Sequence, residues 1–264
     1  MPACAIAVPV WKVVLGLDEV KSLVQCRCVL GGNANYEIVL FGPKRLDWNY
    51  YRSLWSACPC GDRDEPEIAV FDDRCFESRD AYSRLLSAKD FYGRFSGYGH
   101  VLLYQLDAWV FRDELSEWCD AGYDYVGAPW CHLCRMGKGG CSGYESTGFV
   151  GNGGLSLRNV KSFVNALPYD TFDDVVYAQG MNEDLYVSMV GGLRKPPCSE
   201  AARFSVEANA AWLIDNRLGG NLPFGFHGLR VYDGGLFDDL VAKTFAGSEV
   251  MEKAFGKPET SNAN

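Results

Sequence analysis

Residues 101–111 read VLLYQLDAWVF, and this stretch decides how we interpret the rest of the chain. It begins as an apolar run that is short enough to be a buried strand, and it then presents a single acid, Asp107. Ligands of open α/β sheets bind outside the carboxyl ends of the strands. Asp107 is therefore in a position where a ligand is expected.

No Lys or Arg lies within four residues of Asp107, so no neighbour along the chain neutralises its carboxylate. A carboxylate among apolar residues either binds a cation or has a raised pKa. We favour the cation, an Mg²⁺ or Mn²⁺ ion held by oxygen ligands and shared with a substrate phosphate. The alternative is that Asp107 only caps the next turn.

Composition narrows the class of protein. The chain has 264 residues, of which 48% are hydrophobic, and a net charge of −9. The negative charge argues against nucleic acid or anionic lipid as the main partner, and no apolar run is long enough to span a membrane. Residues 5–10 lack the basic leader and the long apolar region of a secretory signal, so we expect a cytoplasmic protein.

The eleven cysteines are an odd number spread along the chain, and we interpret most of them as reduced thiols. Cys131, His132, Cys134 and Cys141 resemble the ligands of a zinc site. Against zinc, Cys131 and His132 are adjacent and can face one ion only in an irregular loop. Both interpretations stay open.

Strands alternate with helices, which is typical of an α/β fold with a mainly parallel central sheet flanked by helices. We find no internal repeat and no linker, so we expect one domain over residues 1–255 and a disordered tail over 256–264. The expected strands lie near residues 4–10, 36–41, 68–71, 123–126 and 151–158, and a further strand runs from residue 101 and ends before Asp107. The expected helices lie near residues 17–30, 80–95, 111–119, 159–167, 182–190 and 236–246.

The helix expected over 80–95 has an apolar stripe that includes Tyr82, Leu85 and Leu86, and Lys89 lies near the middle of this stripe. A lysine at such a position either extends its ammonium group to solvent or projects into a site that holds an anion. Because this helix leads into the strand before Asp107, contact with a phosphate is the functional alternative.

Three further features could form a site with Asp107. The glycines of residues 151–154 let the backbone approach a ligand closely, but they are equally typical of a bulge or a tight turn. Glu183 and Asp184 begin a helix, where the helix dipole stabilises carboxylates, and Asn182 would be its N-cap. His227, between glycine-containing segments, is either a metal ligand or a buried imidazole with satisfied hydrogen bonds.

Taken together, several segments resemble a group of bacterial and viral proteins related to nucleotide-sugar glycosyltransferases of the GT-A fold. They occur in the order of that family and span most of the chain, and the helix over 81–95 fits as well. The segments are YQLDAWVFRDELSEWCDAGYDYVGAPW (104–130), VGNGGLSLRNVKSF (150–163), MNEDLYVS (181–188), EAARFSVE (200–207) and LPFGFHG (222–228).

This resemblance implies where the donor and the metal bind. GT-A enzymes end a strand with a DxD motif that holds a metal ion and the donor diphosphate, and here that position reads Gln105-Leu106-Asp107, so the first acid is an amide. His227 would complete the coordination of Mn²⁺ or Mg²⁺, and Lys89 would neutralise the diphosphate. Pro9, Val10 and Asp72, after the first and third strands, would line the nucleotide pocket.

The resemblance also implies roles on the acceptor side. Asn152, Gly153 and Gly154 would line the pocket for the sugar and the acceptor, and Asp184, or Glu183 in second place, would remove a proton from the acceptor hydroxyl. The loop over 131–148 would close over the donor and exclude water.

The resemblance therefore predicts a single GT-A-like domain that transfers a sugar, in polysaccharide biosynthesis, from a nucleotide-diphosphate sugar to a glycan or another hydroxyl acceptor. Two other classes of protein use the same residues. One is a metal-dependent hydrolase of phosphoesters or glycosyl phosphates, and the other is a non-catalytic carbohydrate-binding module in which Gln105 marks a degenerate site.

Overall fold

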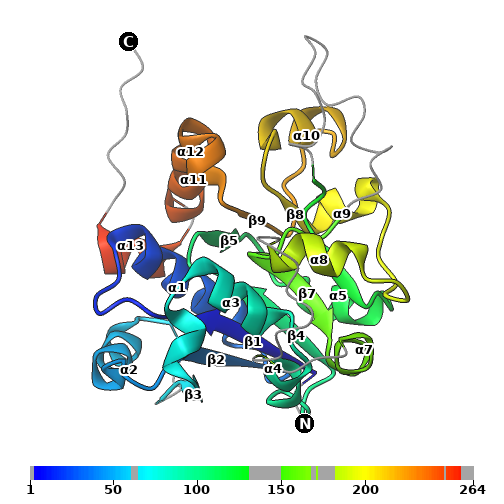
Figure 1. The fold of residues 1–264 in the computed structure, drawn as a ribbon. Helices are drawn as coiled ribbons and strands as arrows, with labels where there is room; N and C mark the ends of the chain where they lie inside the picture. Colours follow the sequence, from blue (N-terminus) through cyan, green and yellow to red (C-terminus); the bar gives the residue numbers. More distant parts are fainter. Residues whose placement is uncertain are drawn as a thin grey trace.

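The strand before Asp107 lies inside a six-stranded sheet of the order β3-β2-β1-β4-β7-β6 (Figure 1). The computed structural model describes residues 3–60, 65–130, 150–167, 171, 182–246 and 248–256. Strands β3, β2, β1 and β4 run parallel, and β7 and β6 continue the sheet in antiparallel pairs. The expected α/β fold with a mainly parallel sheet is confirmed. The strands are β1 Cys4–Pro9, β2 Tyr36–Pro43, β3 Glu67–Phe71, β4 His100–Tyr104, β6 Tyr125–Gly127 and β7 Leu155–Asn159.

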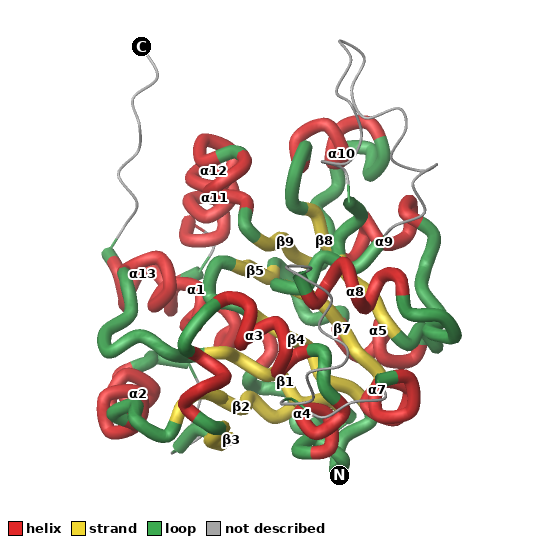
Figure 2. The backbone as a smooth tube through the Cα atoms, viewed as in Figure 1, coloured by secondary structure: helices red, strands yellow, loops and turns green. Residues whose placement is uncertain are grey.

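Both faces of this sheet are covered by helices, and Figure 2 shows the strands in the middle of the molecule with helices around them. In β1, Ile6 packs in one hydrophobic cluster and Ala7 in another, because successive side chains of a strand point to opposite faces. The first face packs against α1 Leu17–Leu30, α2 Trp48–Ala57 and α5 Leu115–Asp120. The second packs against α3 Arg79–Leu86, α4 Lys89–Gly93, α7 Val160–Ala166 and α8 Glu183–Met189.

A second, three-stranded sheet has the order β5-β9-β8, and the sequence did not predict it. Figure 1 shows it between the central sheet and the helices α10 to α12. It packs in a hydrophobic cluster of its own, which includes Trp109, Phe226 and Phe237. Its elements and neighbours are β5 Ala108–Val110, β8 Ser205–Val206, β9 Gly225–His227, α9 Cys198–Phe204, α10 Ala210–Asn216, α11 Leu229–Tyr232, α12 Gly234–Ala246 and α13 Glu249–Phe255.

The strand expected before Asp107 is β4, which ends at Tyr104. Beyond it the chain changes sheets, which the sequence did not predict. After Tyr104, the amide of Gln105 donates to the carbonyl of Gly154 (2.8 Å), and the amide of Ala108 donates back to the carbonyl of Gln105 (2.8 Å). This turn ends β4 and starts β5. Asp107 lies at the corner between the two sheets.

The single helix expected over 80–95 is wrong. The chain forms α3 and then α4, with a break at Ser87 and Ala88. The hydroxyl of Ser87 donates to the carbonyl of Ser83 (2.8 Å), and a serine that bonds to the backbone in this way competes with the continuing helix. Lys89 is consequently the first residue of α4 and does not lie on the middle of an apolar stripe.

The other predicted elements differ mainly at their ends. α1 has the expected bounds, β2 continues through Pro43, and α5 starts at Leu115, four residues after the expected start at Phe111. Within the described segments, no helix combines the length and the apolar character that a membrane span requires.

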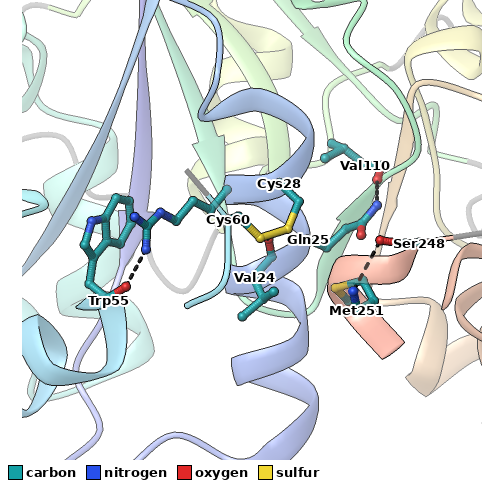
Figure 3. The surroundings of a disulfide bond; sticks show 9 residues. Val24, Gln25, Cys28, Trp55, Cys60, Val110, Ser248 and Met251 are labelled. Carbon is teal, nitrogen blue, oxygen red and sulfur yellow. Dashed lines mark hydrogen bonds between the residues drawn. A yellow bond between two sulfur atoms is a disulfide. The ribbon is translucent and has the colours of Figure 1, made fainter. Parts of the chain in front are cut away.

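A disulfide joins Cys28 of α1 to Cys60, which follows α2, with their Cα atoms 5.1 Å apart (Figure 3). On the same helix, the amide of Gln25 donates to the carbonyl of Val110 in β5 (2.8 Å), so α1 is tied to both sheets. The described free cysteines are Cys4, Cys26, Cys58, Cys75, Cys119 and Cys198. The predicted zinc ligands Cys131, His132, Cys134 and Cys141, and the loop over 131–148, lie outside the described residues, as does the tail from residue 257.

Removal of the disulfide is expected to destabilise the protein. The bond closes a loop of 32 residues, and closing a loop of this size reduces the entropy of the unfolded chain by an amount worth about 3–4 kcal/mol. Cys28→Ser should lower the free energy of unfolding in urea by about that amount. Cys58→Ser, which removes a free thiol nearby, should change it by less than ~1 kcal/mol. Identical urea curves for the wild type and Cys28→Ser would contradict the prediction.

Candidate active site

A cavity opens where the strand order of the central sheet reverses. β1 leads to β2 and β3 on one side and pairs with β4 on the other, and such a switch point is where open α/β sheets bind ligands. A cavity of about 880 Å³ lies there. Its lining includes Trp11 and Lys12, which follow β1, Arg79 and Tyr82 of α3, and Gln105, Leu106 and Asp107, which follow β4.

Pairing of β5 with β9 brings His227 to Asp107. Ala108 is the register partner of His227, and the amide of Gly228 donates to the carbonyl of Asp107 (3.1 Å). The Nε2 atom of His227 lies 3.2 Å from Oδ1 of Asp107 and 3.2 Å from Oε1 of Gln105. Three side chains predicted for the site therefore meet at one ring nitrogen.

Glu207, which the sequence did not single out, lies on the other side of the imidazole. Its Oε1 is 3.2 Å from Nδ1 of His227, and its Oε2 accepts a hydrogen bond from Nδ2 of Asn152 (2.6 Å). Asn152 in turn accepts from the amide of Gly154 (3.2 Å). This chain of contacts links the glycine segment to the histidine.

Burial and the two neighbouring carboxylates act in opposite directions on the His227 pKa. Burial by itself lowers that pKa, but Asp107 and Glu207 outweigh burial and raise it to about 10. Burial likewise acts to raise the pKa of Asp107, and His227 more than compensates, so that pKa is lowered. His227 and Asp107 thus form an imidazolium–carboxylate pair, and a cation at Nε2 would replace the proton.

The side chains around Nε2 fit a divalent ion such as Mn²⁺. A carboxylate oxygen from Asp107, an amide oxygen from Gln105 and an imidazole nitrogen from His227 are ligand types that Mn²⁺ accepts. Over the described ranges, no group of three or more His, Cys, Asp or Glu residues is arranged to hold a metal. A divalent ion bound there would be held by Asp107 and His227 with the amide of Gln105, and it would keep positions open for a substrate phosphate; this metal site stays a prediction.

The two acids at the start of α8 have different surroundings. Glu183 lies 3.3 Å from Nη2 of Arg158, which is completely buried, and Arg158 also donates to the hydroxyl of Tyr92 (2.8 Å). Asp184 accepts hydrogen bonds from the amides of Gly153 (3.2 Å) and Leu185 (2.7 Å). Glu183 is thus held in a buried ion pair, whereas Asp184 has no cationic partner among the described residues.

Burial, followed by the charge of Glu183, raises the pKa of Asp184 to about 7. A general base is most effective when its pKa is near the operating pH. Of the two acids, Asp184 therefore has the environment of a base, and Glu183 has that of a structural partner. Asn182 is the N-cap residue of α8 as expected, but its side chain makes no capping hydrogen bond.

Glycine is required at 153 and 154 because side chains crowd the backbone there. A Cβ on Gly154 would lie 1.9 Å from Nε2 of His227, and one on Gly153 would lie 2.3 Å from Oε1 of Glu183. These two residues therefore allow the histidine from β9 and the acids from α8 to approach the same short segment. The predicted residues Asn152, Gly153, Gly154, Glu183 and Asp184 form this second part of the site.

Four of the predicted donor-site residues lie elsewhere. Pro9 and Val10 are buried, with Val10 only 1% exposed, and Asp72 pairs with Arg74 (3.0 Å). Neither they nor Lys89 are among the residues that line the cavity, so their contact with a donor stays a prediction.

The lining instead includes Trp11, Lys12, Arg79 and Tyr82. Trp11 and Lys12 directly follow the first strand, so they could have been predicted as lining residues from the rule that ligands bind beyond strand ends. Glu207 gave no such signal, because it belongs to no predicted strand or helix.

Comparison with solved structures identifies the class of fold. A galactosyltransferase, LgtC, in complex with donor and acceptor sugar analogs matches 97% of this chain and 98% of its own, with a TM-score of 0.59 and 14% identity. The apo structure of the bifunctional glycosyltransferase WbbM matches 97% of this chain and 52% of its own (TM-score 0.53, 14% identity). The apo glycosyltransferase GlyE of Streptococcus pneumoniae TIGR4 matches 85% and 54% (TM-score 0.51, 11% identity). The chain has the GT-A-like fold that the sequence predicts, and it spans about half the length of WbbM and GlyE.

A match to a protein-family model shows which family the chain belongs to. The model described as "Protein of unknown function (DUF5672)" matches residues 65–227, which is more than half of the chain. The protein belongs to this family. No curated protein sequence matches the chain.

A methyl group at residue 154 is expected to disturb the metal-ligand side of the site. Gly154→Ala forces His227 away from its position or shifts the backbone, and such overpacking costs about 1–3 kcal/mol. The cost should appear in the free energy of unfolding measured with urea. Gly191→Ala is the matched control, because no atom lies within 4 Å of the added Cβ. Equal losses in the two variants would contradict the prediction.

Replacement of Asp184 by asparagine is expected to change how stability depends on pH. A carboxyl with a raised pKa in the folded state gives stability that is complete below its unfolded pKa of about 3.9 and is lost as the pH rises through about 7. The amide in Asp184→Asn does not ionise. The free energy of unfolding of the variant minus that of the wild type should therefore rise between these two pH values and then become constant. A difference that does not change with pH would contradict the prediction.

Proposed function

We propose that this protein is a glycosyltransferase that moves a sugar from a nucleotide-diphosphate sugar to a hydroxyl group of a glycan. The observation that carries the proposal is the meeting of Asp107, Gln105 and His227 at one ring nitrogen, with Asp107 and Gln105 lining the cavity at the switch point of the sheet. The solved structures with this fold named above are glycosyltransferases, which supports the same class of reaction. A role in polysaccharide biosynthesis is part of the proposal.

The cavity offers a separate group to each part of a donor. Trp11 is 45% exposed, and its ring centroid lies 6.0 Å from that of Tyr82, so a planar base can stack on it. Lys12 and Arg79 supply positive charge for the diphosphate. A divalent ion held by Asp107, His227 and Gln105 would neutralise the charge that develops on the leaving diphosphate.

Transfer then requires one proton movement by the protein. The acceptor oxygen bonds to the anomeric carbon, the bond from that carbon to the diphosphate oxygen breaks, and Asp184 takes the proton of the acceptor hydroxyl. The diphosphate leaves with the bonding electrons. The amides of Gly153 and Leu185 donate to the carboxylate of Asp184 and hold it in place.

Donor binding is the first test. A nucleotide-diphosphate sugar at 100 times its Kd should stabilise the protein by about 2.7 kcal/mol, which a thermal-unfolding screen with and without Mn²⁺ detects. Asp107→Asn should weaken the Mn²⁺-dependent part of the shift. Asp215→Asn, at an exposed acid on α10, should leave it unchanged. The absence of a shift with every nucleotide sugar would contradict the proposal.

Turnover separates the roles of the two acids on α8. Asp184→Asn should reduce kcat by about 10²- to 10⁴-fold, which is the usual contribution of a general base, and should leave donor binding intact. Glu183→Gln should act mainly on stability, because it leaves the buried charge of Arg158 unpaired, at a cost of about 3–5 kcal/mol. Release of nucleoside diphosphate and the urea midpoint are the two measurements.

The same assay distinguishes the other classes of protein. Release that does not depend on an acceptor would identify a hydrolase, and binding without release would identify a carbohydrate-binding module. Unchanged turnover in Asp184→Asn would remove this residue from the reaction.

A further inference from the structure

A second cavity lies at the opposite end of the β5–β9 pair from the candidate active site. It has a volume of about 440 Å³ and shares no lining residue with the larger cavity. Beyond Val110 the two segments continue side by side, since the amide of Phe111 donates to the carbonyl of Phe224 (2.9 Å). Arg112 then donates to the carbonyls of Leu222 and Pro223 (3.0 Å each). These bonds fix two walls of the cavity, and α9 forms a third.

The lining carries an excess of positive charge in a chain whose net charge is −9. The charged lining residues are Arg112, Arg203, Arg217, Glu114 and Glu117. Glu114 is already paired with Arg112. Arg203 is exposed, and its guanidinium has no hydrogen-bond or ion-pair partner within the described parts of the chain. An unpaired guanidinium in a cavity is a binding group for a carboxylate, which it can hold with two parallel hydrogen bonds.

The remaining lining suits a ring with several hydroxyl groups. Trp118 contributes an aromatic surface, and such surfaces pack against apolar faces of a ligand. The amide nitrogen of Asn221 donates to the carbonyl of Leu218 (2.9 Å), so its oxygen is left to accept from a hydroxyl. Ser199 and Glu117 add a donor and a further acceptor. The volume falls within the range of about 300–1,000 Å³ that is typical of small-molecule sites, which is larger than a single inorganic anion needs.

We propose that this cavity binds an acidic sugar unit, with the carboxylate of a uronate on Arg203 and its ring hydroxyls on Asn221 and Ser199. The site is separate from the reaction centre, and the proposal does not depend on the proposed transferase activity. Because the walls belong to the segments that continue from β5 and β9, a bound sugar would also hold together the two strands that bring Asp107 and His227 into contact.

Isothermal titration with D-glucuronate and D-glucose tests the proposal on the full chain. Glucuronate should bind with one site per chain, and glucose should bind at least about tenfold more weakly, because a hydrogen bond to a charged group contributes that much. Arg203→Gln should weaken glucuronate binding by at least about tenfold. Its unfolding temperature should be unchanged, since the side chain has no partner to lose.

Two further variants make the result specific. Asn221→Asp places a negative charge in the same cavity and should weaken glucuronate binding more than glucose binding. Arg79→Gln, in the larger cavity, should leave glucuronate binding as in the wild type. No binding of glucuronate, equal binding of the two sugars, undiminished binding by Arg203→Gln, or a loss in Arg79→Gln would each overturn the proposal.

Discussion

The antiparallel pairing of β5 with β9 is the interaction on which the candidate site depends. It aligns Ala108 with His227 and so places an imidazole from the end of the chain beside an acid from its middle. Without this pairing, Asp107 would end a turn at the edge of the central sheet with no partner. With it, the carboxylate, the imidazole and the amide of Gln105 surround one point. The small second sheet is therefore part of the site and not an addition to the fold.

A second constraint is the absence of side chains at residues 153 and 154. The backbone there contacts His227 on one side and the acids of α8 on the other. Asp184 consequently loses contact with water and keeps the negative charge of Glu183 as a neighbour, which raises its pKa. Arg158 pairs with Glu183 and also donates to Tyr92 and Ser156. Glu183 thus has a cationic partner, whereas Asp184 has none among the described residues.

Strong local patterns in the sequence were sufficient to predict most strands of the central sheet. The apolar runs that became β1, β2 and β4 are buried on both faces, and these strands were predicted close to their true bounds, as was α1. β5, β8 and β9 have three, two and three residues. Strands this short have no recognisable alternation of apolar and polar residues, so the sequence did not predict them.

For the site, Gln105, Asp107, Asn152, Gly154, Asp184 and His227 were found by residue type and by family resemblance. Glu207 ends the segment 200–207 that carries the resemblance, but no role was assigned to it, and Arg79 was not singled out. Their places in the candidate site depend on contacts between distant segments. The helix breaks at Ser87, whose hydroxyl donates to a backbone carbonyl of α3. The spacing of apolar side chains cannot predict such a hydrogen bond. The wrong position for Lys89 followed from that break.

The contact between His227 and Gln105 joins residues 122 positions apart. Closing so long a segment costs chain entropy that only the assembled structure repays, and contacts of this range form slowly. The chain must therefore finish most of its folding before the site exists at all. During synthesis, a nascent chain that has not yet emerged as far as β9 therefore cannot bring an imidazole to Asp107 and Gln105, and the candidate site is completed only when the end of the chain folds.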